Sequence, residues 1–105
     1  MQCLQLIDSM YENFLHKIVL IRSVSAGVYY GTLEEVSGMT VRVSKVRNIW
    51  SWEGASCLSQ LANEGIRGGK VSQEVSEIIL TDACEMLPLT EIAILSFNKM
   101  PAWRV

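Results

Sequence analysis

The sequence contains few of the residues from which metal centres and catalytic dyads are built. His16 is the only histidine, and the three cysteines, Cys3, Cys57 and Cys84, lie far apart without a C-x-x-C pair. Zinc knuckles and disulfide frameworks need closely spaced or paired cysteines, and a Cys/His or Ser/His dyad would have to use that one histidine. We therefore predict reduced, mostly buried thiols, no metal and no cofactor, and a protein that binds rather than catalyses.

An excess of positive charge is also missing. Nine lysines and arginines stand against eleven aspartates and glutamates, which gives a formal net charge of −2. Proteins that bind long DNA or RNA usually carry a basic stripe, so long nucleic acid is disfavoured as a partner. A small anion held by a few local cations is compatible with this charge.

Neither a secretory leader nor a membrane span is evident. The chain starts with Met1-Gln2-Cys3-Leu4, which lacks the basic region that opens a signal peptide. No apolar run approaches the roughly 20 residues of a spanning helix. We expect a cytoplasmic protein without a membrane partner.

With 105 residues, two prolines and no long polar linker, the chain is expected to form one domain, 1–105. Half of the residues are hydrophobic, which is typical of a globular domain. This apolar content is slightly high for so small a monomer. It favours either a well-filled core or an apolar surface that forms homo-oligomers.

Alternating and apolar segments predict an α+β fold built on a small antiparallel β-sheet or meander. Strands are expected at 17–24, 28–33, 40–46 and 77–81. The middle two are expected to form a hairpin around Ser37-Gly38.

Two to three short helices are expected beside this sheet. Residues 4–15 have the three- and four-residue apolar spacing of an amphipathic helix. A second helix is expected at 56–64 and a third from Thr90, as the N-cap, to about Asn98. The tail, 99–105, carries so much apolar area that we expect it to dock on its own sheet or on a neighbouring subunit.

The densest group of candidate binding residues lies in the segment 47–54. It places Arg47, Asn48, Trp50 and Trp52 at an expected strand end that leads into a helix, where backbone N–H groups collect anions and indole faces can stack on bases. A nucleotide would suit this combination. The alternative is that the two tryptophans share one face and cap the core, while Arg47 is solvated.

Two further segments are weaker candidates for an anion site. Arg67 and Lys70 flank a glycine pair whose backbone could approach a phosphate, but the spacing is not that of a Walker loop and a solvated flexible loop is the simpler interpretation. Thr90 is first a helix cap, and Glu91 beside it would repel phosphate. Neighbouring acids such as Glu34-Glu35 are interpreted as a solvated edge and not as an acid–base centre.

The chain from residue 17 onward resembles a family of short phage and prophage proteins. The most specific segments are Ser25-Ala26-Gly27, Ile49-Trp50 and Trp52-Glu53-Gly54-Ala55, and other matching positions are Ile21-Arg22-Ser23, Gly31-Thr32-Leu33, Leu61-Ala62, Glu77-Ile78, Thr90-Glu91, Pro101 and Trp103. The helix within 1–16 is the variable part, and 17–105 is the family-like core. The family is similar to the first of the Thoeris anti-defence proteins. These are phage-encoded sponges for cyclic ADP-ribose isomers and, in some members, cyclic di- and trinucleotides.

This resemblance implies a cytoplasmic protein of an infected bacterial host that sequesters a cyclic nucleotide immune signal without cleaving it. It also implies homo-oligomers, dimers that assemble into hexamers, with ligand pockets at subunit junctions. From residue chemistry we expect an arginine on the diphosphate and a tryptophan stacked on the purine. The candidate binding residues are Arg22, Ser23, Arg47, Asn48, Trp50, Trp52, Arg67, Thr90, Trp103 and Arg104.

Two other functions are compatible with the sequence. The chain could be a phage inhibitor or adaptor that docks a host protein through a surface of Trp103, Met100 and Pro101. An enzyme that degrades the messenger is the weakest alternative, because it would need a base or metal centre for which the sequence gives no signal.

Overall fold

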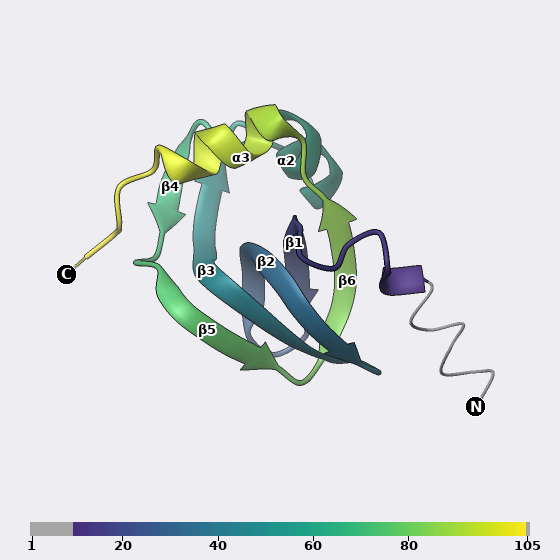
Figure 1. Cartoon of the computed structure of the whole chain (residues 1–105). Coiled ribbons are helices and arrows are strands. Elements are labelled where there is room, and N and C mark those ends of the chain that lie inside the picture. Colours follow the sequence, from purple (N-terminus) through teal and green to yellow (C-terminus); the bar gives the residue numbers. More distant parts are fainter. Residues whose placement is uncertain (1–9, 105) are drawn as a thin grey trace.

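The computed structural model describes residues 10–104, which form a six-stranded antiparallel sheet and two helices (Figure 1). Neighbouring strands follow the order β4-β3-β2-β1-β6, and β5 pairs with β3. This confirms the expected small α+β domain. The elements are β1 (Ile18–Ser23), β2 (Gly27–Ser37), β3 (Thr40–Glu53), α2 (Leu58–Glu64), β4 (Gly68–Val71), β5 (Val75–Leu80), β6 (Ala83–Pro88) and α3 (Glu91–Asn98).

The 14-residue strand β3 organises the sheet because it pairs along both of its edges. One edge is followed by β2 over almost its whole length. On the other edge, β5 pairs with the first half of β3 and β4 with the second half. The strands therefore curl around the core, and Figure 1 shows α2 and α3 together at one end of the curled sheet.

The close approach of β2 to β3 depends on Gly31. A Cβ atom there would lie 2.7 Å from Val43 Cγ1 and 2.9 Å from the backbone oxygen of Ser44. The register between the two strands shifts at this point, between Tyr30 and Thr32. Glycine lets the two backbones meet where the sheet bends.

Buried side chains cover both faces of the sheet. Leu20 of β1 belongs to one core cluster, together with Leu61 of α2 and Phe97 of α3. Val19 and Ile21 belong to a second cluster. Because alternate residues of a strand point to opposite faces, burial on both sides explains the uninterrupted apolar run in β1.

The two helices are joined through the cap of α3. Thr90 Oγ1 accepts a hydrogen bond from the Ala93 N–H at 3.1 Å and donates one to the Asn63 carbonyl of α2 at 2.8 Å. α2 ends at Gly65, which has φ 86°. Both helices were predicted, and Thr90 is confirmed as an N-cap.

The structure corrects the sequence prediction in the middle of the chain. The strand expected at 40–46 continues to Glu53, so most of the segment 47–54 lies within β3 and not at its end, and the helix that follows, α2, begins only at Leu58. The loop expected at 67–70 is largely β4, because the second half of β3 offers a pairing edge that overrides the low strand propensity of two glycines. Strand β6 was not predicted. It lacks regular alternation and ends in proline, as edge strands can.

The expected helix 4–15 lies partly outside the described residues. Met10 and Tyr11 are helical, and the chain then continues in turns, with the Tyr11 carbonyl accepting hydrogen bonds from the Phe14 and Leu15 N–H groups. The helix therefore does not extend to Leu15. Phe14 and Leu15 pack against the second core cluster, which ties this segment to the sheet.

The tail docks on its own sheet, which was one of the two predicted alternatives; the other was docking on a neighbouring subunit. Ala102 forms a parallel bridge with Val71 of β4, and the Trp103 N–H donates to the Val71 carbonyl at 2.8 Å. The tail thus covers an edge of β4 that would otherwise be unpaired.

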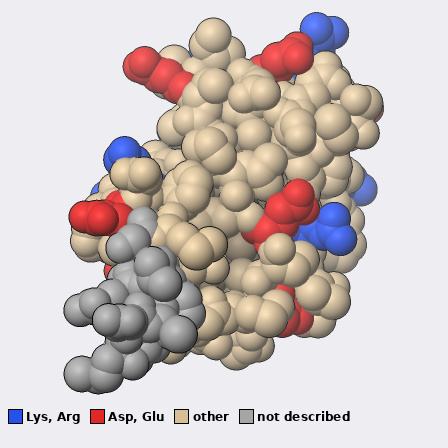
Figure 2. Space-filling view, turned by 90° about the vertical axis from the view of Figure 1, so that its right-hand side faces the viewer, with Lys and Arg blue, Asp and Glu red and all other residues tan. Residues whose placement is uncertain are grey.

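The two cysteines within the described residues are more accessible than expected. Cys57 and Cys84 are free and exposed, whereas buried thiols were predicted; Cys3 lies outside the described part of the chain. Between residues 10 and 104, no helix combines the length and the apolar character that crossing a membrane requires. Figure 2 shows a face of the molecule on which charged side chains are few and scattered.

Candidate ligand-binding surface

Two exposed tryptophans from distant parts of the sequence stack on each other. The ring centroids of Trp50, on β3, and Trp103, in the tail, lie 6.2 Å apart with 25° between the ring planes. Trp50 is 69% exposed and Trp103 is 45% exposed. Indole faces that remain accessible can stack on a planar ligand.

Trp50 and Trp52 do not share an environment, although they are two residues apart in one strand. The register of β3 with β4 shifts between Ile49 and Ser51, next to Trp50. Trp52 is partly buried and packs against the first core cluster. Capping of the core, the alternative considered for both tryptophans, therefore describes Trp52 alone.

Lys70 adds a positive charge to the tryptophan pair. Lys70 lies on β4, the strand that pairs with the second half of β3. Its Nζ is 4.7 Å from the centroid of the Trp103 ring. The ion pairs of the described residues involve His16, Arg22 and Arg42, and not Lys70. An exposed cation–π contact contributes only about 0.5–1 kcal/mol, so the ammonium group can still attract an anion.

A shallow hollow of about 320 Å³ adjoins Trp50. The β1–β2 turn forms one side, and β3 contributes Asn48, Ile49 and Trp50. Gly27 of the turn has φ +97°, which favours glycine, and a Cβ there would come within 3.7 Å of Asn48 Nδ2. Asn48 is itself fixed, because its Nδ2 donates to the Val28 carbonyl at 3.2 Å.

The turn beside this hollow is held by Asp82. The Asp82 carboxylate accepts hydrogen bonds from the Ser23 hydroxyl, from the Ser25 hydroxyl at 2.6 Å and from the Ser25 N–H at 3.0 Å. The hydrogen bond from Ser23, and then those from Ser25, hold the pKa of Asp82 below its usual value. Ser23 is buried and also accepts from the Ala26 N–H, so its hydroxyl is engaged in shaping the turn.

Arg47 is not at this surface. It is 9% exposed, and its guanidinium donates to the carbonyl groups of Ser72, Phe97 and Met100 and to the Tyr30 hydroxyl. All of these bonds are internal to the protein. The solvated Arg47 of the alternative interpretation is not found either.

The remaining candidates are dispersed. Arg22 pairs with Glu85 of β6 at 3.5 Å, and Thr90 caps α3. Arg67 lines a separate hollow beside α3. Arg104 directly follows Trp103 and is exposed. Of the ten expected residues, the structure thus gathers Asn48, Trp50 and Trp103 in one region, with Arg104 next to Trp103 in the chain. It adds Lys70 and the β1–β2 turn, which were not among the ten.

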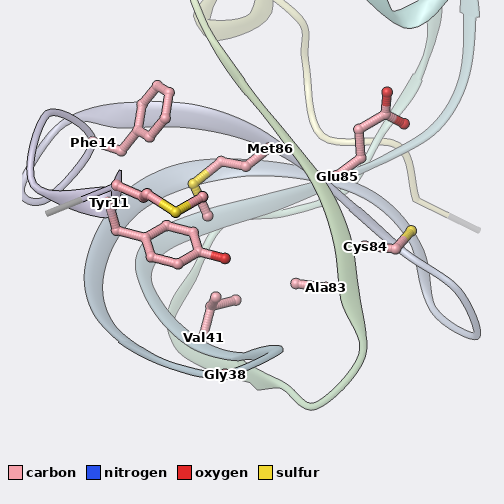
Figure 3. Close-up of a pocket in the computed structure, with 9 residues that line it drawn as sticks. Tyr11, Phe14, Gly38, Val41, Ala83, Cys84, Glu85 and Met86 are labelled. Atoms are coloured by element: carbon pink, nitrogen blue, oxygen red, sulfur yellow. The ribbon is translucent and has the colours of Figure 1, made fainter. Parts of the chain in front are cut away.

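A second hollow, of about 250 Å³, lies between the β2–β3 turn and β6 (Figure 3). Figure 3 shows the Met86 side chain extending from β6 toward Tyr11 and Phe14. Among the described residues that line it, none is a lysine or an arginine. It is therefore less suited to an anionic ligand than the tryptophan pair with Lys70.

Metal ligands are not clustered in the part of the chain that is described. No group of three or more histidine, cysteine, aspartate or glutamate side chains within residues 10–104 could hold a metal ion. The tryptophan pair and Lys70 offer stacking and charge attraction.

Comparison with known proteins gives a match to a protein family. The model of a family described only as a domain of unknown function, DUF6948, matches residues 16–97. No curated protein matches the chain. The matched part begins before β1 and ends within α3, so Trp50 and Lys70 lie inside it, whereas Trp103 and Arg104 follow it.

Proposed function

Since the chain belongs to a family of unknown function, DUF6948, we propose its function from the surface just described: it binds a small nucleotide signal and holds it without cleaving it. The proposed ligands are cyclic ADP-ribose isomers or cyclic di- and trinucleotides. In this proposal the protein is a phage anti-defence sponge in the cytoplasm of an infected bacterium. The observation that carries it is the exposed Trp50–Trp103 stack with Lys70 beside it.

The chemistry of this surface matches the parts of a nucleotide. Stacking of a base on an aromatic side chain contributes about 1–3 kcal/mol, and it requires an accessible ring face such as that of Trp50. Lys70 and Arg104 supply local positive charge for a phosphate in a chain whose net charge is −2. Local cations in an acidic protein favour a small anion over a long polyanion.

A sponge must bind the nucleotide signal more tightly than the receptor of that signal does. An open surface does not easily reach such affinity. The hollow beside Trp50 is shallow, and in a single chain Trp50 is mostly exposed and Trp103 nearly half exposed. A second copy that covers the surface would enclose the ligand. We therefore include homo-oligomers, with the ligand at a subunit junction, in the proposal.

Docking of a host protein is the second candidate function. It is favoured by the same exposed indoles and by Ile92 and Leu95 of α3, which are 70% and 53% exposed. Met100 is a weaker anchor than the sequence suggested, because it packs against the first core cluster. In this case the tryptophans would contact apolar side chains, and Lys70 would be incidental.

A thermal-shift screen against cyclic ADP-ribose isomers and cyclic di- and trinucleotides tests the proposal. A ligand at 100 times its dissociation constant adds about 2.7 kcal/mol to stability, which is several degrees in a domain of this size. The bound ligand, released by heating and identified by chromatography, should be intact. A shift that is undiminished in Trp50→Ala, or no shift with any nucleotide, would contradict the proposal; cleaved ligand would indicate an enzyme.

A further inference from the structure

Within residues 10–104, the buried guanidinium of Arg47 donates to three carbonyl groups and a hydroxyl group and to no carboxylate. Moving a charged group out of water is unfavourable unless its donors are satisfied. Here Nε donates to the Ser72 carbonyl at 2.7 Å, Nη1 to the Phe97 carbonyl at 2.9 Å and to the Tyr30 hydroxyl at 3.2 Å, and Nη2 to the Met100 carbonyl at 2.8 Å. The side chain therefore binds backbone from several segments at once.

These partners lie at the two places that position the tail. Phe97 and Met100 are at the end of α3 and just after it, where the helix dipole favours a cation. The Phe97 carbonyl also accepts a hydrogen bond from the Met100 N–H at 3.1 Å, so it has a backbone donor as well as the guanidinium. Ser72 directly follows Val71, the residue on which the tail docks. One guanidinium thus holds both the start of the tail and the backbone next to its docking point.

The distance along the chain from this contact to the indole is short. Two residues separate Met100 from Trp103, and the Trp103 N–H is bonded to the Val71 carbonyl. The position of the Trp103 ring over Trp50 is therefore determined by backbone that Arg47 fixes. Lys70 adjoins Val71 on the same strand, so its contact with Trp103 depends on the same arrangement.

We propose that Arg47 is a positioning residue, which assembles the Trp50–Trp103–Lys70 surface from β3, β4 and the tail without contacting the ligand. The effect of Arg47 on ligand binding rests on the proposed function. The effect of Arg47 on the arrangement of the tail does not rest on it, and can be measured without any ligand.

The test compares Arg47→Met, which keeps the aliphatic volume, and Arg47→Lys, which keeps the charge but not the planar set of donors. Two stacked indoles give an exciton couplet in circular dichroism. We expect both variants to lose this couplet, as Trp103→Phe should, and to exchange the Trp103 amide hydrogen faster, while a cooperative thermal transition remains. Arg42→Met is the matched control, because this arginine is on the same strand and pairs with Glu35 and Glu77.

In nucleotide binding, Arg47→Met should lose about as much affinity as Trp103→Ala, on the order of 5- to 150-fold. The double variant should lose little more than either single one, because both changes remove the same ring. If wild-type protein binds no nucleotide, the proposed function fails while the couplet and the amide exchange still decide the role of Arg47. A couplet and an amide protection unchanged in both Arg47 variants, or loss of the whole fold in both, would overturn the proposal.

Discussion

Trp50 is the most exposed aromatic residue of the proposed site, and it contributes little to the stability of the fold. A large indole that remains 69% exposed contributes little burial to the folded state. Trp52, two residues away, packs against the core cluster that includes Leu61 and Phe97. The two residues can therefore separate a binding role from a structural role within one strand.

Trp50→Ala should weaken nucleotide binding by about 1–3 kcal/mol, the usual contribution of one stacked base. Its free energy of unfolding should change by no more than about 0.5 kcal/mol, as for other exposed positions. Trp52→Ala should show the reverse: lower stability, by at least about 1 kcal/mol, and nearly unchanged affinity. Isothermal titration and urea unfolding of both variants measure these values, and equal affinity losses in the two would contradict the assignment.

Asp82 should give the protein a pH-dependent stability through the turn that lines the hollow. Its carboxylate has a lower pKa in the folded chain than in the unfolded one, because Ser23 and Ser25 donate to it. The resulting stabilisation is fully present above the unfolded-state pKa, about 3.9, and is lost as the pH falls through the lower folded-state pKa. Tm should therefore decrease over this acidic range.

Asp82→Asn isolates this contribution from that of Glu34, whose pKa is also lowered, by hydrogen bonds from Ser44 and His16. The variant should melt below wild type at pH 6, and the difference in Tm should shrink as the pH decreases below about 4. A difference that is constant from pH 6 to pH 2.5 would show that the charge of Asp82 does not stabilise the turn.

At the scale of elements, the helices and the first strands were predictable because local signals agree with the fold. Thr90 is followed by a helical pattern, and a glycine ends α2. β1 reads as a strand because burial on both faces leaves an unbroken apolar run. For such elements, tertiary contacts only confirm what the local sequence favours.

Strand β4 and the second half of β3 could not be predicted in the same way. Gly68-Gly69 favours a loop when considered alone, and only the free edge of β3 makes it a strand. Within β3, the buried Arg47 interrupts the apolar alternation, and its burial is possible only because three backbone carbonyls from two later segments surround it. These are non-local causes, which a pattern along the chain does not contain.

The Thr90 cap provides a test at the level of a helix. Thr90→Ala removes the acceptor for the Ala93 N–H and the donor to the Asn63 carbonyl, so we expect a loss of about 1–2 kcal/mol in the free energy of unfolding. Thr90→Ser should retain most of the stability. Since the cap is separate from the tryptophan surface, nucleotide affinity should be unchanged in both variants, and an affinity loss would reinstate Thr90 as a ligand residue.

At the scale of the whole molecule, the proposed site is assembled from segments that lie far apart in the sequence. It joins the β1–β2 turn, the middle of β3, Lys70 of β4 and the tail. Trp50 and Trp103 were both candidates from their chemistry. Their stacking could not be foreseen, because it depends on the parallel bridge between Ala102 and Val71.

Self-association is the prediction that concerns the molecule as a whole. Ile92 and Leu95 lie three residues apart, hence on one face of α3, and both are mostly exposed. A formal net charge of −2 offers little repulsion between copies, and burial of such a face is favourable at about 25 cal/mol per Å² of apolar surface. We therefore expect copies of the chain to associate through α3.

Light scattering coupled to gel filtration should give a mass that is a multiple of the 11.8 kDa of one chain. The double variant Ile92→Glu with Leu95→Glu should elute as a monomer, because two charges would have to be buried in the contact. Ile79→Glu, an equally exposed position on β5, is the control and should leave the mass unchanged. If the ligand lies at a subunit junction, the monomeric variant should also bind nucleotide more weakly than wild type. If the wild-type protein is a monomer, copies of the chain do not associate through α3. The ligand site would then have to be formed by the tryptophan surface of a single chain.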